Sequence, residues 1–243
     1  MLACSGVIGL WAVGFYTPDL IRQVQTKPLT QSVYEREIAA AKAANDATRT
    51  AQLEEIYSLW KEGETQTPAG LTDVKKTLDS EIKLTLTKNQ SYTSIALNVG
   101  AFLGMFSFGA VSQRIGRKPT FAIALIAAFI TTVFVFYTLQ ELWQIFVLVP
   151  IMGFFQLSLF GGYAVYFPEL FPTYLRSTGT SFCYNVGRFL AAFGPLVKIG
   201  LNNAFSGTQA PLRYAGMTMC VVFLVGLFVL PFLPETRGQP LPE

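Results

Sequence analysis

The chain has 243 residues, of which 51% are hydrophobic and only 14% are charged, and its net charge is +3. Its mean hydropathy of +0.42 excludes an ordinary soluble domain, in which about a quarter of the residues are charged. The sequence contains no histidine, which excludes an imidazole proton relay and any histidine-based metal site or nucleophile. Ten of the 18 Lys and Arg and ten of the 15 Asp and Glu lie between Arg22 and Lys88, so the rest of the chain is very poor in charge.

Long apolar blocks occupy that remainder, and a helix needs about 20 such residues to cross a bilayer. Continuous apolar character favours helices over barrel strands, which alternate. The alternative is a large soluble helical core, but a run such as "FAIALIAAFITTVFVFY" lacks the polar face of a soluble helix. We therefore predict an all-α polytopic membrane protein with six transmembrane helices, at about Leu2–Ile21, Ser91–Gln113, Pro119–Leu139, Leu142–Phe167, Leu175–Leu201 and Leu212–Leu233.

The first block, Leu2–Ile21, has no basic segment before it and no cleavage site after it, so it is not a secretory signal. The simpler interpretation is that a segment upstream is missing, or that translation starts within a longer frame. This block forms the first of three predicted domains, 1–21, 22–90 and 91–243, of which the last holds five spans and a cytoplasmic tail.

Residues 22–90 predict a helical extracytoplasmic insert, because the stretch is rich in Ala, Glu and Lys and its apolar residues recur at helical spacing. "TPAG" at Thr67–Gly70 breaks this pattern, and a shorter helix at about Leu71–Leu86 would return the chain to the bilayer. The alternative is that this insert binds a partner or forms a cap, but we favour a solvent-exposed helical insert without such a role.

The orientation follows from Arg114, Arg117 and Lys118, since Lys and Arg in short loops mark the cytoplasmic side. Alternation of the spans then places 169–176 and the tail 234–243 on the same side. We predict an inner or plasma membrane protein with a cytoplasmic carboxy terminus.

Three joints carry motifs. The joint after the second span has Gly109 followed by "QRIGRK" from Gln113, the next cytoplasmic joint reads "YFPELFPTYLRSTGTS", and the tail begins "PETRG" at Pro234. They resemble the inter-helix loop signature, the E-x-F-P-x-x-x-R-x-x-G element and the closing P-E-T-K-G element of the major facilitator superfamily. In this order, each at the cytoplasmic end of the right span, they make the chain resemble the carboxy-terminal six-span half of a sugar-porter-like or metabolite-symporter-like member.

The resemblance covers nearly everything except the insert. It implies a secondary active transporter of a small organic solute, such as a sugar or an organic acid, that works by alternating access. We do not predict an enzyme, because the sequence shows no paired carboxylates, metal ligands or activated nucleophile at one depth. The chain departs from the family in lacking the first half, in its long insert and in having Gln113 where the loop signature often has Asp.

The motif residues also form a predicted cytoplasmic gate. Gly109 would let a neighbouring helix approach closely, and Gly116 would turn the chain tightly. Arginine forks and carboxylates in one layer can hold helix ends together while the protein faces outward. The alternative is simple anchoring to lipid headgroups. The predicted gate set is Gly109, Gln113, Arg114, Gly116, Arg117, Glu169, Arg176, Glu235 and Arg237.

Polar residues at mid-depth are costly in a membrane and predict the substrate site. Arg188 lies 12 residues after Arg176, hence about 18 Å along a helix and near the middle of the bilayer. It forms a polar stripe with Ser181, Tyr184 and Asn185, and we add Gln156 and Asn98 as further substrate-binding candidates. The alternative for Arg188 is a buried structural pair.

We expect a small solute, the lipid bilayer and a missing amino-terminal six-span half as partners, with no cofactor, no metal and no nucleic acid. No phosphate-cradling Gly-rich loop with its Lys is present, so direct use of ATP is not predicted. The alternative function is a six-span scaffold or receptor-like protein that presents the insert outside.

Overall fold

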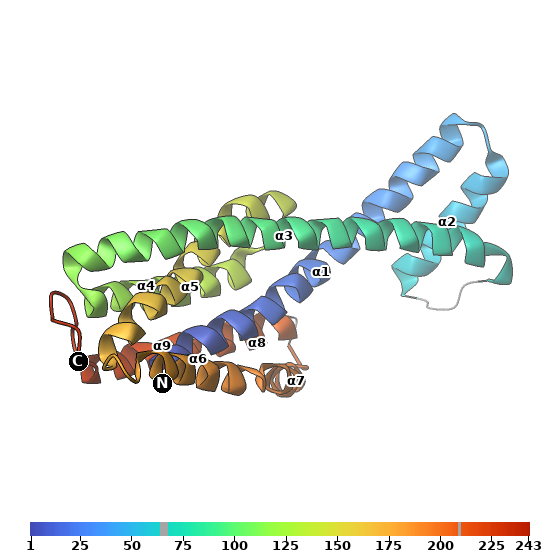
Figure 1. The fold of residues 1–243 in the computed structure, drawn as a ribbon. Helices are drawn as coiled ribbons and strands as arrows, with labels where there is room; N and C mark the ends of the chain where they lie inside the picture. Colours follow the sequence, from blue (N-terminus) through green and yellow to red (C-terminus); the bar gives the residue numbers. More distant parts are fainter. Residues whose placement is uncertain (64–67, 209) are drawn as a thin grey trace. The chain divides into compact units, whose positions relative to one another are not determined.

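The computed structural model describes residues 1–63, 68–208 and 210–243, with the backbone alone at 12–16 and 69. All regular structure within these ranges is helical (Figure 1), so the predicted all-α class is confirmed for them. The elements are α1 (Leu2–Ala43), α2 (Ala47–Glu62), η1 (Ala69–Leu71), α3 (Thr72–Ile115), α4 (Arg117–Thr138), α5 (Leu142–Leu170), α6 (Arg176–Ala191), α7 (Gly194–Ala204), α8 (Pro211–Met219), α9 (Val221–Val229) and η2 (Leu230–Phe232).

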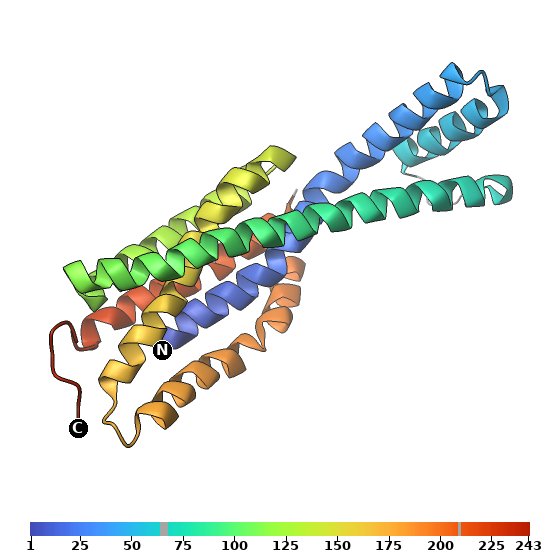
Figure 2. The same ribbon diagram turned by 45° about the horizontal axis from the view of Figure 1, so that its top comes forward.

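The chain divides into two compact units. The larger unit contains Met1–Leu20 and Tyr92–Glu243, and the smaller one contains Ile21–Ser91. In the larger unit α4 packs against α5 and α9, α5 packs against α6, and α7 packs against α8 (Figure 2). The larger unit contains every residue of the predicted gate and of the predicted substrate site.

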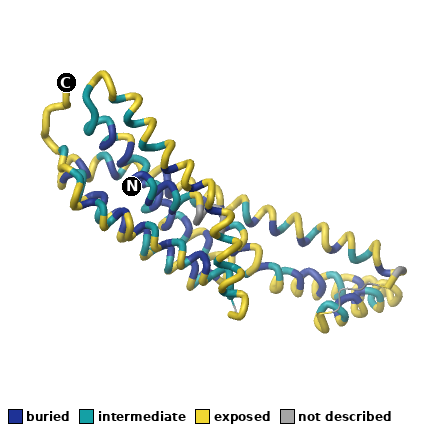
Figure 3. The backbone as a smooth tube through the Cα atoms, turned by 90° about the horizontal axis from the view of Figure 1, so that it is seen from below, coloured by how far each residue is buried: buried dark blue, intermediate teal, exposed yellow. Residues whose placement is uncertain are grey.

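Four of the described helical stretches are long and apolar enough to cross a bilayer, namely Thr72–Ile115, Arg117–Thr138, Leu142–Leu170 and Pro211–Phe232. They correspond to the second, third, fourth and sixth predicted spans. Within the described part of the first predicted span, Leu2–Trp11 is a shorter apolar segment, and residues 12–16 lie outside the search. Many exposed residues on the outer sides of these helices (Figure 3) are large and apolar, as expected where lipid is the solvent. The protein is an integral membrane protein.

The fifth predicted span, Leu175–Leu201, is not one continuous helix. It is divided at Ala192 and Phe193 into α6 and α7. Pro195 lies in the first turn of α7, where a proline is tolerated because the helix does not need its missing N–H. Within an unbroken helix the same ring would clash with the carbonyl one turn earlier. The expectation of a single helix over these residues is therefore corrected to two short ones.

Glycines bring α3 and α5 into backbone contact. A Cβ atom at Gly100 or Gly104 of α3 would overlap a backbone carbonyl of α5, and a Cβ at Gly153 or Gly161 of α5 would overlap a carbonyl of α3. Small residues allow such close helix approach in membranes. At Gly109, where we predicted the close approach of a neighbouring helix, no described atom lies within 4 Å of a Cβ built there, so the described part of the chain shows no such approach.

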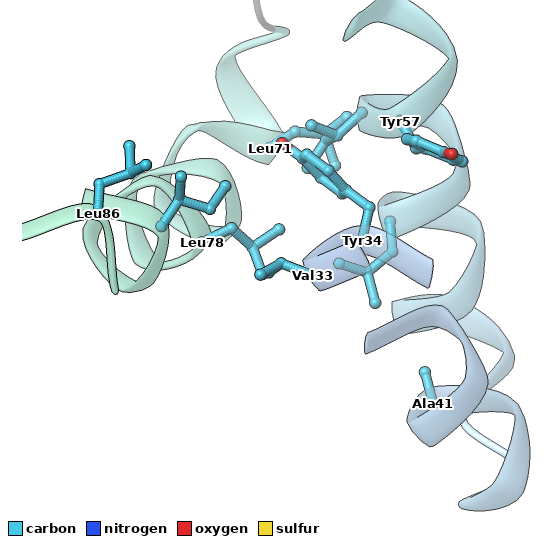
Figure 4. Packing of buried hydrophobic residues seen from close by; sticks show 10 residues of the cluster. Val33, Tyr34, Ala41, Tyr57, Leu71, Leu78 and Leu86 are labelled. Carbon is cyan, nitrogen blue, oxygen red and sulfur yellow. The ribbon is translucent and has the colours of Figure 1, made fainter. Parts of the chain in front are cut away.

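The smaller unit has its own hydrophobic core (Figure 4). Tyr34, Tyr57 and Trp60 stack on one another with ring centroids 5.5 to 6.4 Å apart. The buried members of the core come from α1, α2, η1 and α3, and are Val33, Tyr34, Ala41, Leu53, Ile56, Tyr57, Leu71, Leu78, Ile82 and Leu86.

Helix boundaries in this unit differ from the prediction. The first long helix ends at Ala43, and Asn45 has a positive φ of 55°, so α2 is a separate helix. The predicted helix at Leu71–Leu86 and the second predicted span are one helix, α3. The predicted break at Thr67–Gly70 begins outside the described residues. That 22–90 lies outside the membrane remains a prediction.

Candidate functional site

The turn between α3 and α4 depends on Gly116. Its φ is +102°, a region that side chains with a Cβ rarely adopt. A Cβ at this position would also lie 2.9 Å from Oε2 of Glu235. Gly116 therefore lets the chain reverse direction and lets the carboxyl-terminal segment approach the start of α4.

Arg117, the first residue of α4, forms the central ion pair of the site. Its Nη2 and Nε atoms donate to the two carboxylate oxygens of Glu169 at 2.6 and 3.1 Å. Its Nη1 atom donates to the carbonyl of Ser112 at 3.0 Å. The side chains of Arg117 and Glu169 are only 12% and 18% exposed. This forked geometry is the strong form of an arginine–carboxylate pair.

The carboxyl-terminal segment completes this cluster. The hydroxyl of Thr236 donates to Oε2 of Glu169 at 2.5 Å. The hydroxyl of Tyr166 on α5 donates to the carbonyl of Pro234 at 2.6 Å, and Nζ of Lys118 donates to the carbonyl of Pro231 at 3.0 Å. The segment after the last apolar helix is thus fastened to both α4 and α5.

Glu235 caps the amino terminus of α4. Its carboxylate accepts the backbone N–H groups of Arg117 at 2.8 Å and Lys118 at 2.9 Å, and that of Arg237 at 3.0 Å. These are donors that a helix start leaves without an intrahelical partner. Burial raises the pKa of the Glu235 carboxyl, but the N–H donors lower it more, so the pKa lies below its ordinary value of 4.5.

Not every predicted gate residue joins the cluster. Gln113 and Arg114 are exposed and form no hydrogen bond or ion pair with the described residues. The side chain of Arg237 is likewise without such a partner there. We expected Arg176 to pair with a carboxylate. Its guanidinium instead donates to the backbone carbonyls of Pro168 at 3.1 Å and Pro242 at 3.3 Å. The sequence analysis missed Lys118, Tyr166 and Thr236 as members, although Thr236 lies inside the motif "PETRG".

The predicted substrate stripe lines one pocket. Ser181, Tyr184, Asn185 and Arg188 of α6 face Phe160, Tyr163, Ala164 and Phe167 of α5 around a hollow of about 370 Å³. The guanidinium carbon of Arg188 lies 5.4 Å from the centroid of the Tyr184 ring, a cation–π distance. Thr180, which we did not predict, also lines this pocket, and its buried hydroxyl has no hydrogen-bond partner among the described residues.

Arg188 borders a second hollow as well. Together with Trp11, Ala191, Ala192 and Pro195 it lines about 240 Å³ at the break between α6 and α7. Arg188 lies in the last turn of α6, where the helix dipole favours a positive charge. It forms no ion pair with any carboxylate in the described part of the chain.

The other two candidates lie elsewhere. Gln156 is buried and donates from Nε2 to Oγ1 of Thr132 on α4 at 2.7 Å, so it ties two helices together. Asn98 is exposed on α3 and donates to the carbonyl of Ser94 in its own helix at 2.8 Å. The structure does not bring either residue into the pocket around Arg188. Among the residues searched, no group of three metal-ligating side chains occurs.

Comparisons with known proteins agree with the order of the motifs. The sequence model of the family described as Major Facilitator Superfamily matches residues 77–243. The chain is 28% identical over 165 residues to a Haemophilus influenzae protein named for metabolite transport. It is 33% identical over 147 residues to the "Probable 4-methylmuconolactone transporter" of Cupriavidus pinatubonensis, and 30% identical over 164 residues to the "Cis,cis-muconate transport protein" of Acinetobacter baylyi.

These three matches cover 68%, 60% and 67% of this chain, but only 39%, 33% and 38% of the relatives. The chain therefore spans about two fifths or less of the curated relatives it matches. None of the three relatives is named as an enzyme.

Proposed function

Because the chain belongs to the Major Facilitator Superfamily, we propose that it works in a secondary transporter that moves a small organic acid across a membrane by alternating access. The observation that carries this proposal is Arg188, a cation without a carboxylate partner in the described chain that lines a partly aromatic pocket. The named relatives support the choice of solute, since muconate is an organic acid.

Placing the guanidinium of Arg188 inside the membrane costs free energy that a partner must offset. A guanidinium near the middle of a bilayer costs roughly 2.5–3.5 kcal/mol on insertion scales, so such residues are retained where they line a cavity or meet a partner. The aromatic ring of Tyr184 and the carboxyl end of α6 compensate only part of this cost. A carboxylate ligand would supply the forked partner that the described chain lacks.

The substrate class follows from the walls of the pocket. Phe160, Tyr163 and Phe167 offer apolar, planar surface, while Ser181 and Asn185 offer hydrogen-bonding groups beside the cation. This combination suits a carboxylate on an apolar or unsaturated skeleton better than a sugar, which would need several polar contacts and no cation. We favour an organic acid over a sugar for this reason.

The cluster around Arg117 and Glu169 would then serve as the gate on the cytoplasmic side, and its contacts would separate when the site opens to that side. The complete transport unit would include an amino-terminal half that supplies the facing wall of the cavity. In this arrangement the carboxy terminus would lie in the cytoplasm and residues 22–90 would lie on the other side of the membrane. Bound lipid and the solute would be the other partners.

An uptake assay tests the proposal. The complete transporter is expressed in cells that lack organic acid uptake, and accumulation of radiolabelled cis,cis-muconate and of a labelled neutral sugar is measured. We expect uptake of the acid, and we expect Arg188→Lys to lower it about 10- to 100-fold by losing the forked geometry. The matched control is Arg213→Lys, which should keep most uptake, because Arg213 donates to the backbone carbonyls of Tyr137 and Leu139 and does not line the pocket around Arg188.

Undiminished uptake in Arg188→Lys, with normal amounts of protein in the membrane, would remove Arg188 from the substrate site. Uptake of the sugar but not of the acid would overturn the proposed substrate class. Absence of transport for every solute would favour a scaffold.

A further inference from the structure

A second charged contact joins two distant parts of the larger unit. Nζ of Lys198 on α7 donates to the carboxylate of Asp19 on α1, and the two side chains are 19% and 49% exposed. The residues are 179 positions apart. The other carboxylate side chains of the larger unit, apart from the terminal Glu243, have different contacts: Glu169 and Glu235 belong to the cluster around Arg117, and Glu141 caps α5.

The pair lies at the end of the unit opposite the gate cluster. The carbonyl of Leu2 accepts the hydroxyl of Tyr163 at 2.9 Å, and Tyr163 lies on α5 fewer than two turns before Glu169. Asp19 follows Leu2 by 17 residues on the same helix, which is about 25 Å at 1.5 Å per residue. One end of the unit therefore carries the Arg117–Glu169 pair and the other end carries the Asp19–Lys198 pair.

A helix break separates Lys198 from Arg188. At the break the N–H of Ala192 still bonds to the carbonyl of Arg188 at 3.1 Å, but the N–H of Phe193 bonds to that of Leu190 at 3.2 Å, the tighter pattern of a 3-10 turn. Helix α7 then restarts for 11 residues. A short helix after such a break can tilt with few changes of backbone dihedral angle.

The hollow between Arg188 and Trp11 lies at this break and is lined by Ala192 and Pro195. A tilt of α7 about the break would therefore change access to Arg188. The Asp19–Lys198 pair is a charged contact between α7 and α1, and α7 also packs against α8. A partly exposed pair stabilises a protein little, which suits a contact that must form and break in every cycle.

We propose that Asp19 and Lys198 are positioning residues that form the second gate of this half: their ion pair holds α7 in place beside the hollow that Arg188 lines, and α7 tilts about Ala192 and Phe193 when the pair separates. This inference rests on the transport function proposed above and adds the control of access to the same site from the side opposite the Arg117–Glu169 cluster.

Labelling of a cysteine at the break tests the inference without any substrate. The complete transporter carries Ala192→Cys together with Cys4→Ser, Cys183→Ser and Cys220→Ala, and a membrane-impermeant maleimide is added on the side of Asp19. Ala192 is exposed and lines the hollow. We expect Asp19→Asn and Lys198→Gln each to raise the labelling rate about two- to fivefold, the change in population that an ion pair of this exposure can supply.

Two further variants separate the charge interaction from a merely structural role. The charge-swapped pair Asp19→Lys with Lys198→Asp should return the labelling rate to that of the parent. Glu141→Gln is the matched control. Glu141 is a carboxylate between the carboxyl end of α4 and the start of α5, and its described contacts are with α5. This substitution should leave the rate unchanged.

Equal labelling of the parent and both single variants would overturn the inference, and so would a charge-swapped pair that labels as fast as the single variants. If Asp19→Asn inserts poorly, Lys198→Gln and the charge-swapped pair still decide the question. Unchanged labelling beside intact Arg188-dependent uptake refutes the second gate alone. Failure of the acid-uptake assay beside a labelling response refutes the proposed substrate and leaves the gate contact standing.

Discussion

The two arginines that flank Gly116 should behave very differently, although both belong to one basic motif. Arg117 donates twice to Glu169 and once to Ser112, whereas Arg114 is exposed and has no polar partner among the described residues. We therefore predict that Arg117→Ala destabilises the protein strongly and that Arg114→Ala does not. The pair is well matched, because both changes remove the same side chain from the same short segment.

The loss of unfolding free energy in each variant can be estimated from the contacts that its arginine makes. Hydrogen bonds to charged groups contribute about 1.5–3 kcal/mol each, and removing one partner of a buried ion pair costs about 3–5 kcal/mol. The Arg117 and Glu169 side chains are 12% and 18% exposed, and Thr236 still donates to Glu169 after the change. We discount the cost for both reasons to about 2–4 kcal/mol. For Arg114→Ala we expect a change within about 0.5 kcal/mol, as at other exposed positions.

Thermal unfolding of the detergent-purified protein measures the difference. With about 2–4 °C of Tm per kcal/mol for a chain of this size, Arg117→Ala should lower Tm by about 4–16 °C. Size-exclusion chromatography of heated samples gives the fraction that remains monodisperse. Equal Tm values for the two alanine variants would refute the assignment of Arg117 as the structural member of the motif, and a larger effect of Arg114→Ala would reverse it.

Three further predictions address the rest of the larger unit and the core of the smaller one. The pKa of Glu235 is lowered in the folded protein, so its contacts contribute stability that is present above pH 4.5 and lost as the pH falls through the folded value. Hydrogen exchange of the amides of residues 235–238, corrected for their intrinsic rates, should accelerate only in that acidic range, and Glu235→Gln should abolish the dependence. Gly104→Leu should lower Tm far more than Gly109→Leu, because a side chain at Gly104 would overlap a carbonyl of α5 whereas one at Gly109 would meet no described atom; similar values would contradict the α3–α5 contact. Ile56→Ala in the core of the smaller unit should cost about 2–5 kcal/mol and speed hydrogen exchange in 21–91, while exchange in α4 and α5 stays unchanged.

Hydropathy predicted the parts of the fold that depend on length and apolar character alone. The stretches now seen as α4 and α5 are long, apolar and bounded by charged or turn-forming residues, so the requirement to span about 30 Å of hydrocarbon fixes them. Gly116 was predictable for a related reason, because a reversal between two helices needs a residue that tolerates a positive φ.

Contacts between segments far apart in the chain were not predictable in the same way. The motif contains Arg114, Arg117 and Lys118 as equivalent cations, and nothing local decides which one reaches Glu169. That choice depends on where α4 begins relative to the end of α5. The role of Thr236 depends on the same geometry, because its hydroxyl reaches Glu169 only when the tail folds back onto α4 and α5.

The break in the fifth predicted span could not be seen in the mean hydropathy of a stretch of about 20 residues, because that average does not show where a helix ends. Gly194 and Pro195 lie in a stretch whose mean apolar character still suits a span, and membrane helices often tolerate proline because neighbouring groups satisfy the freed carbonyls. Sequence alone therefore favoured continuity. The estimate of about 18 Å from Arg176 to Arg188 survives, since α6 is unbroken between them. What changes is the surroundings of Arg188, which lies beside a helix end and a hollow instead of in mid-helix. Arg188 lies at the end of α6, and the next helix, α7, contacts α1 through the Asp19–Lys198 ion pair. Movement of α7 alone would therefore change the exposure of Arg188.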